Sequence, residues 1–468
     1  MSFKVYGYIT VTTVLFQVIY NAQSTAFIDE IFHIPQAKKY CSGQFNEWDP
    51  KITTLPAMYI LSMLVLTPLT GIKGSSACTV WALRYMNVLY NAGTVVLAYY
   101  IIKKLNENVK SSNAGTEDEE SNKKHHFTSL TVGFFPLLYF LSFLYYTEPG
   151  STLLVLAAYL ACLHGNHKLA AGLGFLAILF RQNNIVWVVF MGGAVAADHL
   201  ETIKDIERIS TSPELKDKLA RFLAKLAAAL LKYLLVIDHL RAVAILIWPY
   251  LSVICVFCLF AYLNNGIVVG DRSSHVAIFH PAQLLYFLGF SLFFGSPVLI
   301  SLDKFKRFVH TFRKYPIHFG ASAMLCLYVL LAYTHIHPYL LADNRHYAFY
   351  VWKYFLGRRF LRFCFIPIYI YAAWSMNDSL KLSERCTVLW KIVFVVCVSA
   401  VLVPQKLLEF RYFILPYLLF RLHIKNQSVM VLILEVTLQV VLNIATISIF
   451  LNKTFSWSDL DEPQRIMW

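Results

Sequence analysis

The stretch that decides the fold is residues 26–37, which read AFIDEIFHIPQA. It places two adjacent carboxylates, Asp29 and Glu30, directly after the apolar segment Val5 to Tyr20, which is long enough to cross most of a bilayer. If that segment spans a membrane, the two acids lie at its far water interface. Acidic side chains at a membrane edge are costly and tend to be functional. We therefore expect the rest of the chain to form the scaffold and the walls of a site around this pair.

The composition is that of a membrane protein. Of the 468 residues, 58% are hydrophobic, 16% are aromatic and only 15% are charged, and the mean hydropathy is +0.55. Soluble proteins carry about 25% charged residues, so a soluble all-helical protein is disfavoured. The net charge of +14 comes from basic residues in short clusters between apolar runs. Such clusters are typical of cytosolic loops and need no nucleic-acid partner.

The apolar runs predict an all-α polytopic membrane protein with roughly 12–13 transmembrane helices. We expect one integral membrane domain over residues 1–468. The candidate spans are residues 5–22, 79–102, 127–146, 150–163, 168–180, 184–199, 242–263, 282–301, 318–334, 359–376, 388–403, 412–421 and 429–451.

Residues 55–72 are also apolar, and they could form either a span or a helix lying against the membrane face. If they do not span, the basic clusters all fall on one side, as the positive-inside rule requires. We adopt this topology. It makes residues 103–126 and 200–241 cytosolic loops, and it places residues 23–75, with the acidic pair, in the first loop of the opposite face.

The cytosolic loops show no sign of a soluble nucleotide-binding site, because neither has a phosphate-cradling glycine pattern. Residues 106–126 mix Asn, Ser, Lys and Glu and are expected to be disordered. Residues 200–241 are expected to contain an interfacial amphipathic helix, with apolar positions at Leu215, Leu219, Phe222, Leu223 and Leu226. Cys255 and Cys258 form a CxxC inside an apolar run, where a buried packing role is expected.

The acidic pair is the first candidate for catalysis. One of two neighbouring carboxylates in a low-dielectric cleft is well suited to act as a general base. Adjacent side chains on a helix point about 100° apart, so Asp29 and Glu30 are expected to have different roles. The alternative is an ordinary juxtamembrane pair that merely faces water.

Other polar residues on the same face are candidates for substrate binding. Trp48 and Asp49 combine an aromatic ring and a carboxylate, which suits sugar binding, although a capping role is the alternative. Glu148 is a further candidate for substrate binding, although a helix-capping role is favoured for it. Arg181 and Gln182 suit contacts to phosphate or sugar hydroxyls, whereas an interfacial Arg can also simply snorkel.

Two further stretches suggest a cationic clamp for a phosphate leaving group. One contains Asn344, Arg345 and His346, and the other contains Arg411. Arg can bind a phosphate through two parallel hydrogen bonds. An ion pair with Glu409 is the alternative for Arg411. No metal-ligand cluster is evident, so we expect catalysis without a metal or other cofactor.

Five blocks of the sequence together resemble the family of dolichyl-phosphate-glucose-dependent α-1,2-glucosyltransferases, which add the last glucose to the lipid-linked N-glycan precursor. The blocks are FIDEIFHIPQAKKYC (27–41), WDPKITTLPAMY (48–59), FRQNNIVWVVF (180–190), LLADNRHYAFYVWK (340–353) and PQKLLEFRYFILPYLLFRL (404–422). The chain departs from the family at Leu55-Pro56, where the family has Pro-Pro.

The resemblance implies a glycosyltransferase of the GT-C class in the endoplasmic reticulum membrane, with its active site facing the lumen. The donor would be dolichyl-phosphate glucose, and the acceptor the diglucosylated oligosaccharide on dolichyl pyrophosphate. The base in this class is an acid of the first luminal loop, which points to Asp29 or Glu30, with Asp29 favoured. A β-linked donor that yields an α-glucoside requires inversion by a single displacement.

Three other interpretations remain at this point: a multi-span transporter, a channel-modulating membrane partner without catalysis, and a transferase that uses dolichyl-phosphate mannose. A transporter is expected to carry a two-fold internal repeat and broken helices in paired positions, and the sequence shows no clear repeat. The sequence gives no prediction about protein partners.

Overall fold

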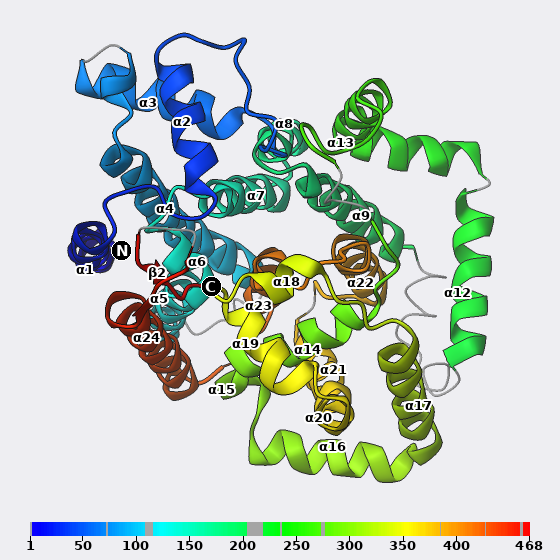
Figure 1. Cartoon of the computed structure of the whole chain (residues 1–468). Coiled ribbons are helices and arrows are strands. Elements are labelled where there is room, and N and C mark those ends of the chain that lie inside the picture. The colour runs from blue at the N-terminus through cyan, green and yellow to red at the C-terminus, as the bar shows by residue number, and fades with distance from the viewer. Residues whose placement is uncertain are drawn as a thin grey trace.

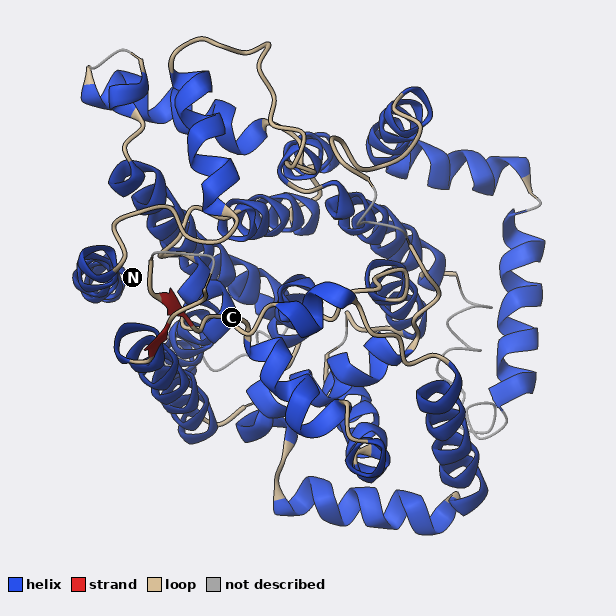
Figure 2. Ribbon diagram, viewed as in Figure 1, coloured by secondary structure: helices blue, strands red, loops and turns tan. Residues whose placement is uncertain are grey.

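The computed structural model describes residues 2–71, 74–107, 116–203, 219–234, 236–272, 277–383, 385–425, 427–458 and 462–468. The regular secondary structure of the described residues is almost entirely helical (Figure 2). Two strands of two residues each, which the all-α prediction does not contain, form a small antiparallel pair near the C-terminus.

The helices of the N-terminal half are α1 (Ser2–Ala22), α2 (Glu30–Cys41), α3 (Ala57–Thr70), η1 (Ser75–Ala77), α4 (Val80–Asn106), α5 (Thr116–Gly133), α6 (Pro136–Leu141), α7 (Thr147–Leu163), α8 (His167–Phe180), η3 (Gln182–Asn184) and α9 (Ile185–Glu201). The elements that follow are α12 (Leu219–Leu234), α13 (Ile237–Leu263), α14 (Ala282–Phe294), α15 (Ser296–Leu299), α16 (Leu302–Lys314), α17 (Pro316–Ala332), α18 (Pro338–Ala342), α19 (Tyr347–Val351), η4 (Trp352–Leu356), α20 (Arg359–Cys364), α21 (Ile366–Leu380), α22 (Val388–Leu402), η5 (Phe410–Phe413), α23 (Ile414–Leu422), α24 (Val429–Asn452), β1 (Thr454–Phe455) and β2 (Gln464–Arg465).

Prolines divide three of the expected spans. The runs 127–146, 282–301 and 359–376 each break into two helices, and the second helix of each pair has a proline in its first turn. A proline lacks the backbone N–H that would continue the preceding helix, but it fits the first turn of a new one. The expectation of one continuous helix in each of these runs is therefore wrong.

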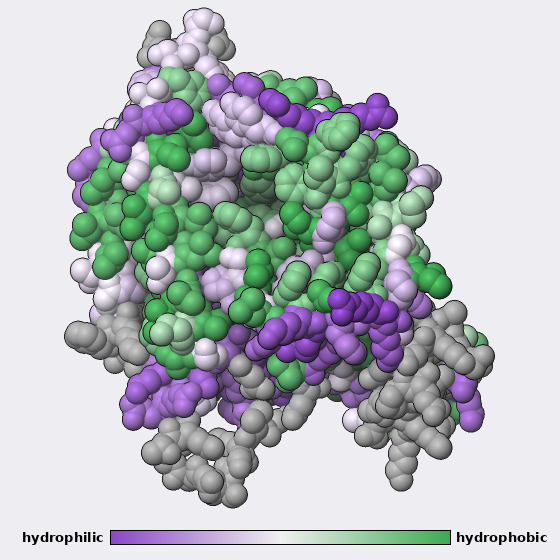
Figure 3. Space-filling model, turned by 90° about the horizontal axis from the view of Figure 1, so that it is seen from below, coloured by the Kyte–Doolittle hydropathy of each residue, from purple (hydrophilic) through white to green (hydrophobic). Residues whose placement is uncertain are grey.

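The chain is an all-α membrane protein. By length and composition, α13 and α24 can each cross a membrane, and α16 with α17 makes a third candidate if the pair, bent by 99°, counts as one span. Several shorter apolar helices accompany them. The surface carries a broad hydrophobic belt above a band of hydrophilic side chains (Figure 3). At 14 residues, α3 is one of these shorter apolar helices.

Of the two predictions about the cytosolic loops, the disorder of 106–126 is partly wrong and the helix within 200–241 is present. Residues 108–115 lie outside the described residues, whereas the expected disorder of 106–126 is wrong at Asn106, which ends α4, and from Thr116 onward, where α5 begins. Exposed ion pairs four residues apart, Glu119–Lys123 and Glu120–Lys124, stabilise its first turns. The helix expected within 200–241 is present as α12, although Leu215 lies outside the described residues. Leu226 of α12 is buried.

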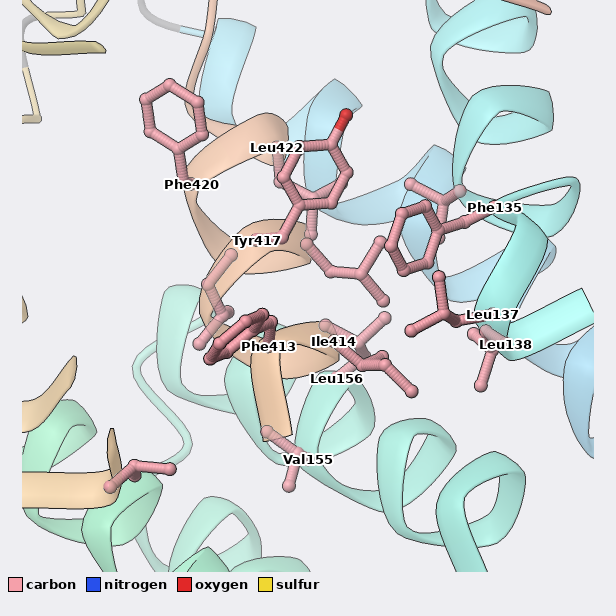
Figure 4. Close-up of a cluster of buried hydrophobic side chains, with 14 of the residues drawn as sticks. Phe135, Leu137, Leu138, Val155, Leu156, Phe413, Ile414, Tyr417, Phe420 and Leu422 are labelled. Carbon is pink, nitrogen blue, oxygen red and sulfur yellow. The ribbon is translucent and has the colours of Figure 1, made fainter. Parts of the chain in front are cut away.

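Buried aromatic and aliphatic side chains pack α23 against α6 and α7 (Figure 4). The ring of Tyr417 stacks on Phe135 with their centroids 4.9 Å apart. Phe413 and Ile414 at the start of α23 lie in the same cluster, near Leu156 of α7. This packing fixes the short helix η5, which carries Arg411, relative to the helices of the N-terminal half.

A disulfide joins Cys41 at the end of α2 to Cys78 just before α4. This pairing was not predicted from the sequence. Cys255 and Cys258, expected to be buried, are exposed on α13, because they lie outside the face, with Tyr250 and Val253, that α13 buries in the bundle. The disulfide closes a loop of 37 residues around α3.

We expect Cys41→Ser to lower the stability of the protein by about 2–4 kcal/mol, because the cross-link restricts the unfolded chain. Thermal unfolding in detergent measures this loss. Cys258→Ser, which removes an exposed free thiol on α13, is the matched control. A Cys41→Ser variant that unfolds at the wild-type temperature, or a Cys41 thiol that alkylates without reductant, contradicts the pairing.

Candidate active site

The segment before α2 turns sharply so that Asp29 faces a pocket. Ile28 has a φ of +54°, a left-handed conformation that is strained for a β-branched residue and that tends to occur at functional sites. After this turn the backbone N–H of Asp29 donates to the hydroxyl of Tyr146 at 3.3 Å. Asp29 is the N-cap residue of α2, yet its side chain makes no capping bond. Its carboxylate is therefore directed to another partner.

The structure separates the two acids of the pair. Glu30 is completely buried, and all its hydrogen bonds go to the protein. Arg84 of α4 donates through Nε to Oε1 at 2.8 Å and through Nη2 to Oε2 at 2.6 Å. The backbone N–H groups of Tyr145 and Phe27 donate to the same carboxylate at 2.6 and 2.9 Å. Glu30 thus joins α2 to α4 and to the segment between α6 and α7, and it does not line the pocket.

Asp29 lines a pocket of about 740 Å³. The pocket lies between α2, the loop after α8, the segment 337–348 and the segment 404–412. It brings together six residues that the sequence analysis selected: Asp29, Arg181, Gln182, Arg345, His346 and Arg411. Residues more than 300 positions apart in the chain meet there.

Arg411 is the central cation of this pocket. Its Nη1 donates to Asp29 Oδ2 at 2.9 Å, and its Nη2 donates to Glu409 Oε1 at 2.9 Å. The expected ion pair with Glu409 is therefore present, together with a second pair to Asp29. Glu148 Oε1 lies 3.9 Å from the same guanidinium. Two carboxylates hold Arg411 in a fixed orientation at the pocket wall.

These contacts set the charge state of the pocket. Burial is the largest single effect on Asp29 and raises its pKa, but the charge and hydrogen bond of Arg411 and the nearby His33 and His346 together lower it more, so its net pKa lies below the usual value. Burial likewise raises the pKa of Glu409, but Arg411 and His346 together lower it more, so its net pKa is also below the usual value. Burial lowers the pKa of His33 to about 4. At neutral pH both acids are therefore ionised and His33 is neutral.

His33 is a pocket residue to which the sequence analysis assigned no role. It follows Asp29 by four residues on α2, so both side chains lie on one face of the helix. Its Nδ1 is 2.6 Å from the hydroxyl of Tyr59 on α3. The i, i+4 spacing from Asp29 was the signal that could have identified it. Trp457, which also lines the pocket, has no such signal in the sequence.

Arg345 is held by an acid of its own loop. Its Nε and Nη2 donate to the two oxygens of Asp343 at 2.9 and 2.7 Å, and its Nη1 donates to Gln464 at 3.0 Å. The guanidinium lies over the ring of Trp457, 4.5 Å from its centroid. Asp343, Gln464 and Trp457 therefore hold the guanidinium of Arg345 in one orientation at the pocket.

Four predicted substrate-binding residues do not line this pocket: Trp48, Asp49, Glu148 and Asn344. The indole of Trp48 packs on Tyr59 and donates to Ile52 O at 3.3 Å. Asp49 accepts from the backbone of Lys51 at 2.9 Å and stabilises a turn. These two residues stabilise the segment that begins at Trp48, in which Lys51, Ile52, Thr53 and Thr54 line the pocket.

Glu148 and Asn344 bind pocket residues instead of facing the pocket. Glu148 pairs with Arg181, and α7 has no side-chain cap, so the predicted capping role of Glu148 is wrong. Asn344 Oδ1 accepts from the indole of Trp457 at 3.0 Å. Gln182 does line the pocket, and its amide donates to Thr53 O at 2.8 Å. Among the residues that the structure describes, no group of three or more His, Cys, Asp or Glu side chains could hold a metal ion.

Fold and site together define an all-α membrane protein with a charged pocket built around an aspartate–arginine pair. The chain belongs to the DIE2/ALG10 family, whose sequence model matches residues 23–422. The resemblance seen in the five sequence blocks is thereby confirmed.

Similar proteins from animals and plants share nearly the whole chain. A human relative is 42% identical over 470 residues, which cover 98% of this chain and 96% of the relative. A Drosophila melanogaster relative is 35% identical (96% and 95% covered), and one from Arabidopsis thaliana is 33% identical (94% of both). All three are named Dol-P-Glc:Glc(2)Man(9)GlcNAc(2)-PP-Dol alpha-1,2-glucosyltransferase. No solved structure matches the chain.

Proposed function

We propose that this protein transfers glucose from dolichyl-phosphate glucose to the diglucosylated lipid-linked oligosaccharide and forms an α-1,2 linkage. The observation that carries the proposal is the similarity over 98% of the chain to a relative named for this reaction. The pocket supports it, because an ionised carboxylate and a fixed guanidinium side by side suit glycosyl transfer from a phosphate. No observation favours a transporter or a channel-modulating partner.

In the proposed reaction Asp29 is the general base. It accepts the proton of the acceptor's 2-hydroxyl while that oxygen bonds to C1 of the donor glucose. The bond between C1 and the phosphate oxygen breaks at the same time, and dolichyl phosphate leaves with the electron pair. One displacement of this kind inverts the anomeric centre, so a β-linked donor yields the α product.

The cations of the pocket are proposed to stabilise the leaving phosphate. Arg411 binds Asp29 before the reaction. When Asp29 takes up the proton its charge disappears, and the Nη1–H of Arg411 becomes free to bind the departing phosphate. Arg345 and His346 line the same pocket and complete the proposed clamp. Preorganised cations of this kind stabilise charge that develops in the transition state.

The proposed setting is the endoplasmic reticulum membrane, with a GT-C architecture, roughly 12–13 spans and the pocket facing the lumen. The disulfide between Cys41 and Cys78 supports this orientation. It lies in the same loop as Asp29, and disulfides persist in oxidising compartments.

The test is glucosyl transfer by the purified protein from synthetic dolichyl-phosphate glucose to a diglucosylated lipid-linked acceptor. We expect transfer from the glucose donor and none from dolichyl-phosphate mannose. Transfer from the mannose donor alone overturns the substrate assignment. Failure with both donors overturns the proposed activity and favours a non-catalytic membrane partner.

The charge state of the pocket predicts a broad pH plateau. With the pKa of Asp29 below its usual value and that of His33 at about 4, kcat/KM is expected to stay constant from about pH 5 to about pH 8. Activity falls only as Asp29 and His33 become protonated below that range. An acid limb centred near pH 6.5 contradicts the neutral state of His33.

The stability of the fold is expected to change over a different range. The unfolded chain protonates His33 near its ordinary pKa of about 6.5, whereas the folded chain keeps it neutral down to about 4. The unfolded state therefore binds more protons between these values, and the free energy of unfolding decreases as the pH falls through them. Unfolding temperatures recorded in the same buffers as the kinetic assays separate this effect from catalysis.

A further inference from the structure

The segment after α24 returns to the pocket. Its described residues, 453–458 and 462–468, are called the tail segment below. Strands β1 and β2 pair antiparallel within it, with Thr454 opposite Arg465. Beyond β2, the N–H of Met467 donates to Arg345 O at 2.7 Å, and Met467 O accepts from Tyr347 N at 3.0 Å. Figure 1 shows this part of the chain running from α24 towards α18 and α19.

Arg465 anchors the tail segment to two helix ends. Its Nη1 donates to the carbonyls of Phe450 and Leu451 at 2.8 and 2.9 Å, and its Nη2 donates to Ala22 O at 3.0 Å. These carbonyls end α24 and α1, where helices leave acceptors unsatisfied and where a cation is favoured. The side chain is 8% exposed. Arg465 therefore fixes the tail segment to the ends of α1 and α24.

Two other side chains of the tail segment contact residues of the pocket. Gln464 accepts from Arg345 at 3.0 Å and is itself buried. Trp457 lines the pocket, carries the guanidinium of Arg345 over its ring at 4.5 Å, and donates its indole N–H to Asn344 at 3.0 Å. The orientation of the indole is thus determined from both sides. Residues 23–422 match the family model, so this wall of the pocket comes from beyond the matched region.

We propose that Trp457 is a specificity-determining residue that stacks against the terminal glucose of the acceptor, with Gln464 and Arg465 as positioning residues for it. The inference rests on the proposed function. The donor brings a phosphate, which the arginines bind, whereas the acceptor enters the pocket as neutral carbohydrate. A flat aromatic ring matches the apolar face of a hexose, because Trp presents a large apolar surface, and aromatic side chains are common in the lining of small-molecule pockets.

The test is steady-state kinetics with each substrate varied in turn. We expect Trp457→Ala to raise the KM for the acceptor roughly tenfold. The KM for the donor and kcat are expected to stay within about twofold of wild type, because Asp343 and Gln464 still hold Arg345. Trp457→Phe keeps an aromatic face and is expected to stay within about threefold of the wild-type KM for the acceptor. Trp248→Ala is the matched control, because that indole also carries a cation, Lys168 at 5.9 Å, but does not line the pocket.

Trp457→Leu distinguishes stacking from volume, and it remains informative if the alanine variant fails to fold. The proposal predicts that Leu behaves like Ala and Phe like Trp. Equal acceptor KM values for Trp, Phe and Leu overturn it. So does an effect confined to the donor KM or to kcat, because Trp457 then acts only through Arg345. A wild-type protein that transfers no glucose rejects the proposed function itself, and the inference with it.

Discussion

Replacing Asp29 by Asn is expected to lower glucosyl transfer by roughly 10²–10⁴-fold, the contribution of a positioned general base. Asn has nearly the same shape but cannot accept the proton of the attacking hydroxyl. The loss should appear in kcat, because the amide can still occupy the position of the carboxylate at the pocket wall. The unfolding temperature is expected to stay close to that of wild type, since the carboxylate of Asp29 is about one-third exposed (36%) and pairs of this kind contribute little to stability.

Asp49→Asn is the matched control for this experiment. Asp49 lies on the same loop region and stabilises a turn, but it does not line the pocket, so its amide is expected to retain activity. Transfer by Asp29→Asn within about tenfold of wild type contradicts the role of Asp29 as the base. An equal loss in both variants shows that the loop, and not the carboxylate, is responsible.

Glu30→Gln is expected to destabilise the fold by about 3–5 kcal/mol, because it leaves the buried guanidinium of Arg84 without its counter-charge. Both side chains are 0% exposed. The same substitution weakens the contacts to the backbone N–H groups of Phe27 and Tyr145. Any loss of activity should follow the fraction of unfolded protein and should not appear as a lower kcat of the folded enzyme.

Thermal and denaturant unfolding of the detergent-solubilised protein measure this effect. Glu119→Gln removes one partner of an exposed ion pair with Lys123 and is expected to change stability by less than about 1 kcal/mol. If Glu30→Gln unfolds like wild type yet abolishes transfer, Glu30 takes part in catalysis, and the separation of the two acids must be revised. The two substitutions thus distinguish a catalytic acid from a structural one at adjacent positions.

The broad features of this protein were predictable because they depend on composition and local pattern. Recurrent apolar runs and few charges indicate a membrane protein whatever its tertiary structure. The resemblance of five sequence blocks to the glucosyltransferase family is confirmed over residues 23–422. Pro136, Pro297 and Pro367 mark the breaks in three runs that the span assignment joined, and these breaks could have been read from the sequence, since proline seldom continues a helix.

The composition of the pocket was only partly predictable. Asp29 and Arg411 were selected from the sequence, but nothing in it indicated that they pair across 382 positions. Trp48 and Asp49 were selected for the same chemical reasons, yet they support a wall and do not line the pocket. Residue type identifies candidates, whereas the packing of distant segments decides which of them face one cavity.

The sequence by itself determined the membrane class and the family, and it singled out Asp29 and Glu30 as candidates. Tertiary structure decided the difference between those acids. A helix turns about 100° per residue, so adjacent side chains face different surroundings, and Arg84 from α4 encloses Glu30 while Asp29 stays open to the pocket. It also brought the tail segment to the site and joined Cys41 to Cys78. These contacts lie between residues far apart in the chain, and no local sequence pattern specifies them.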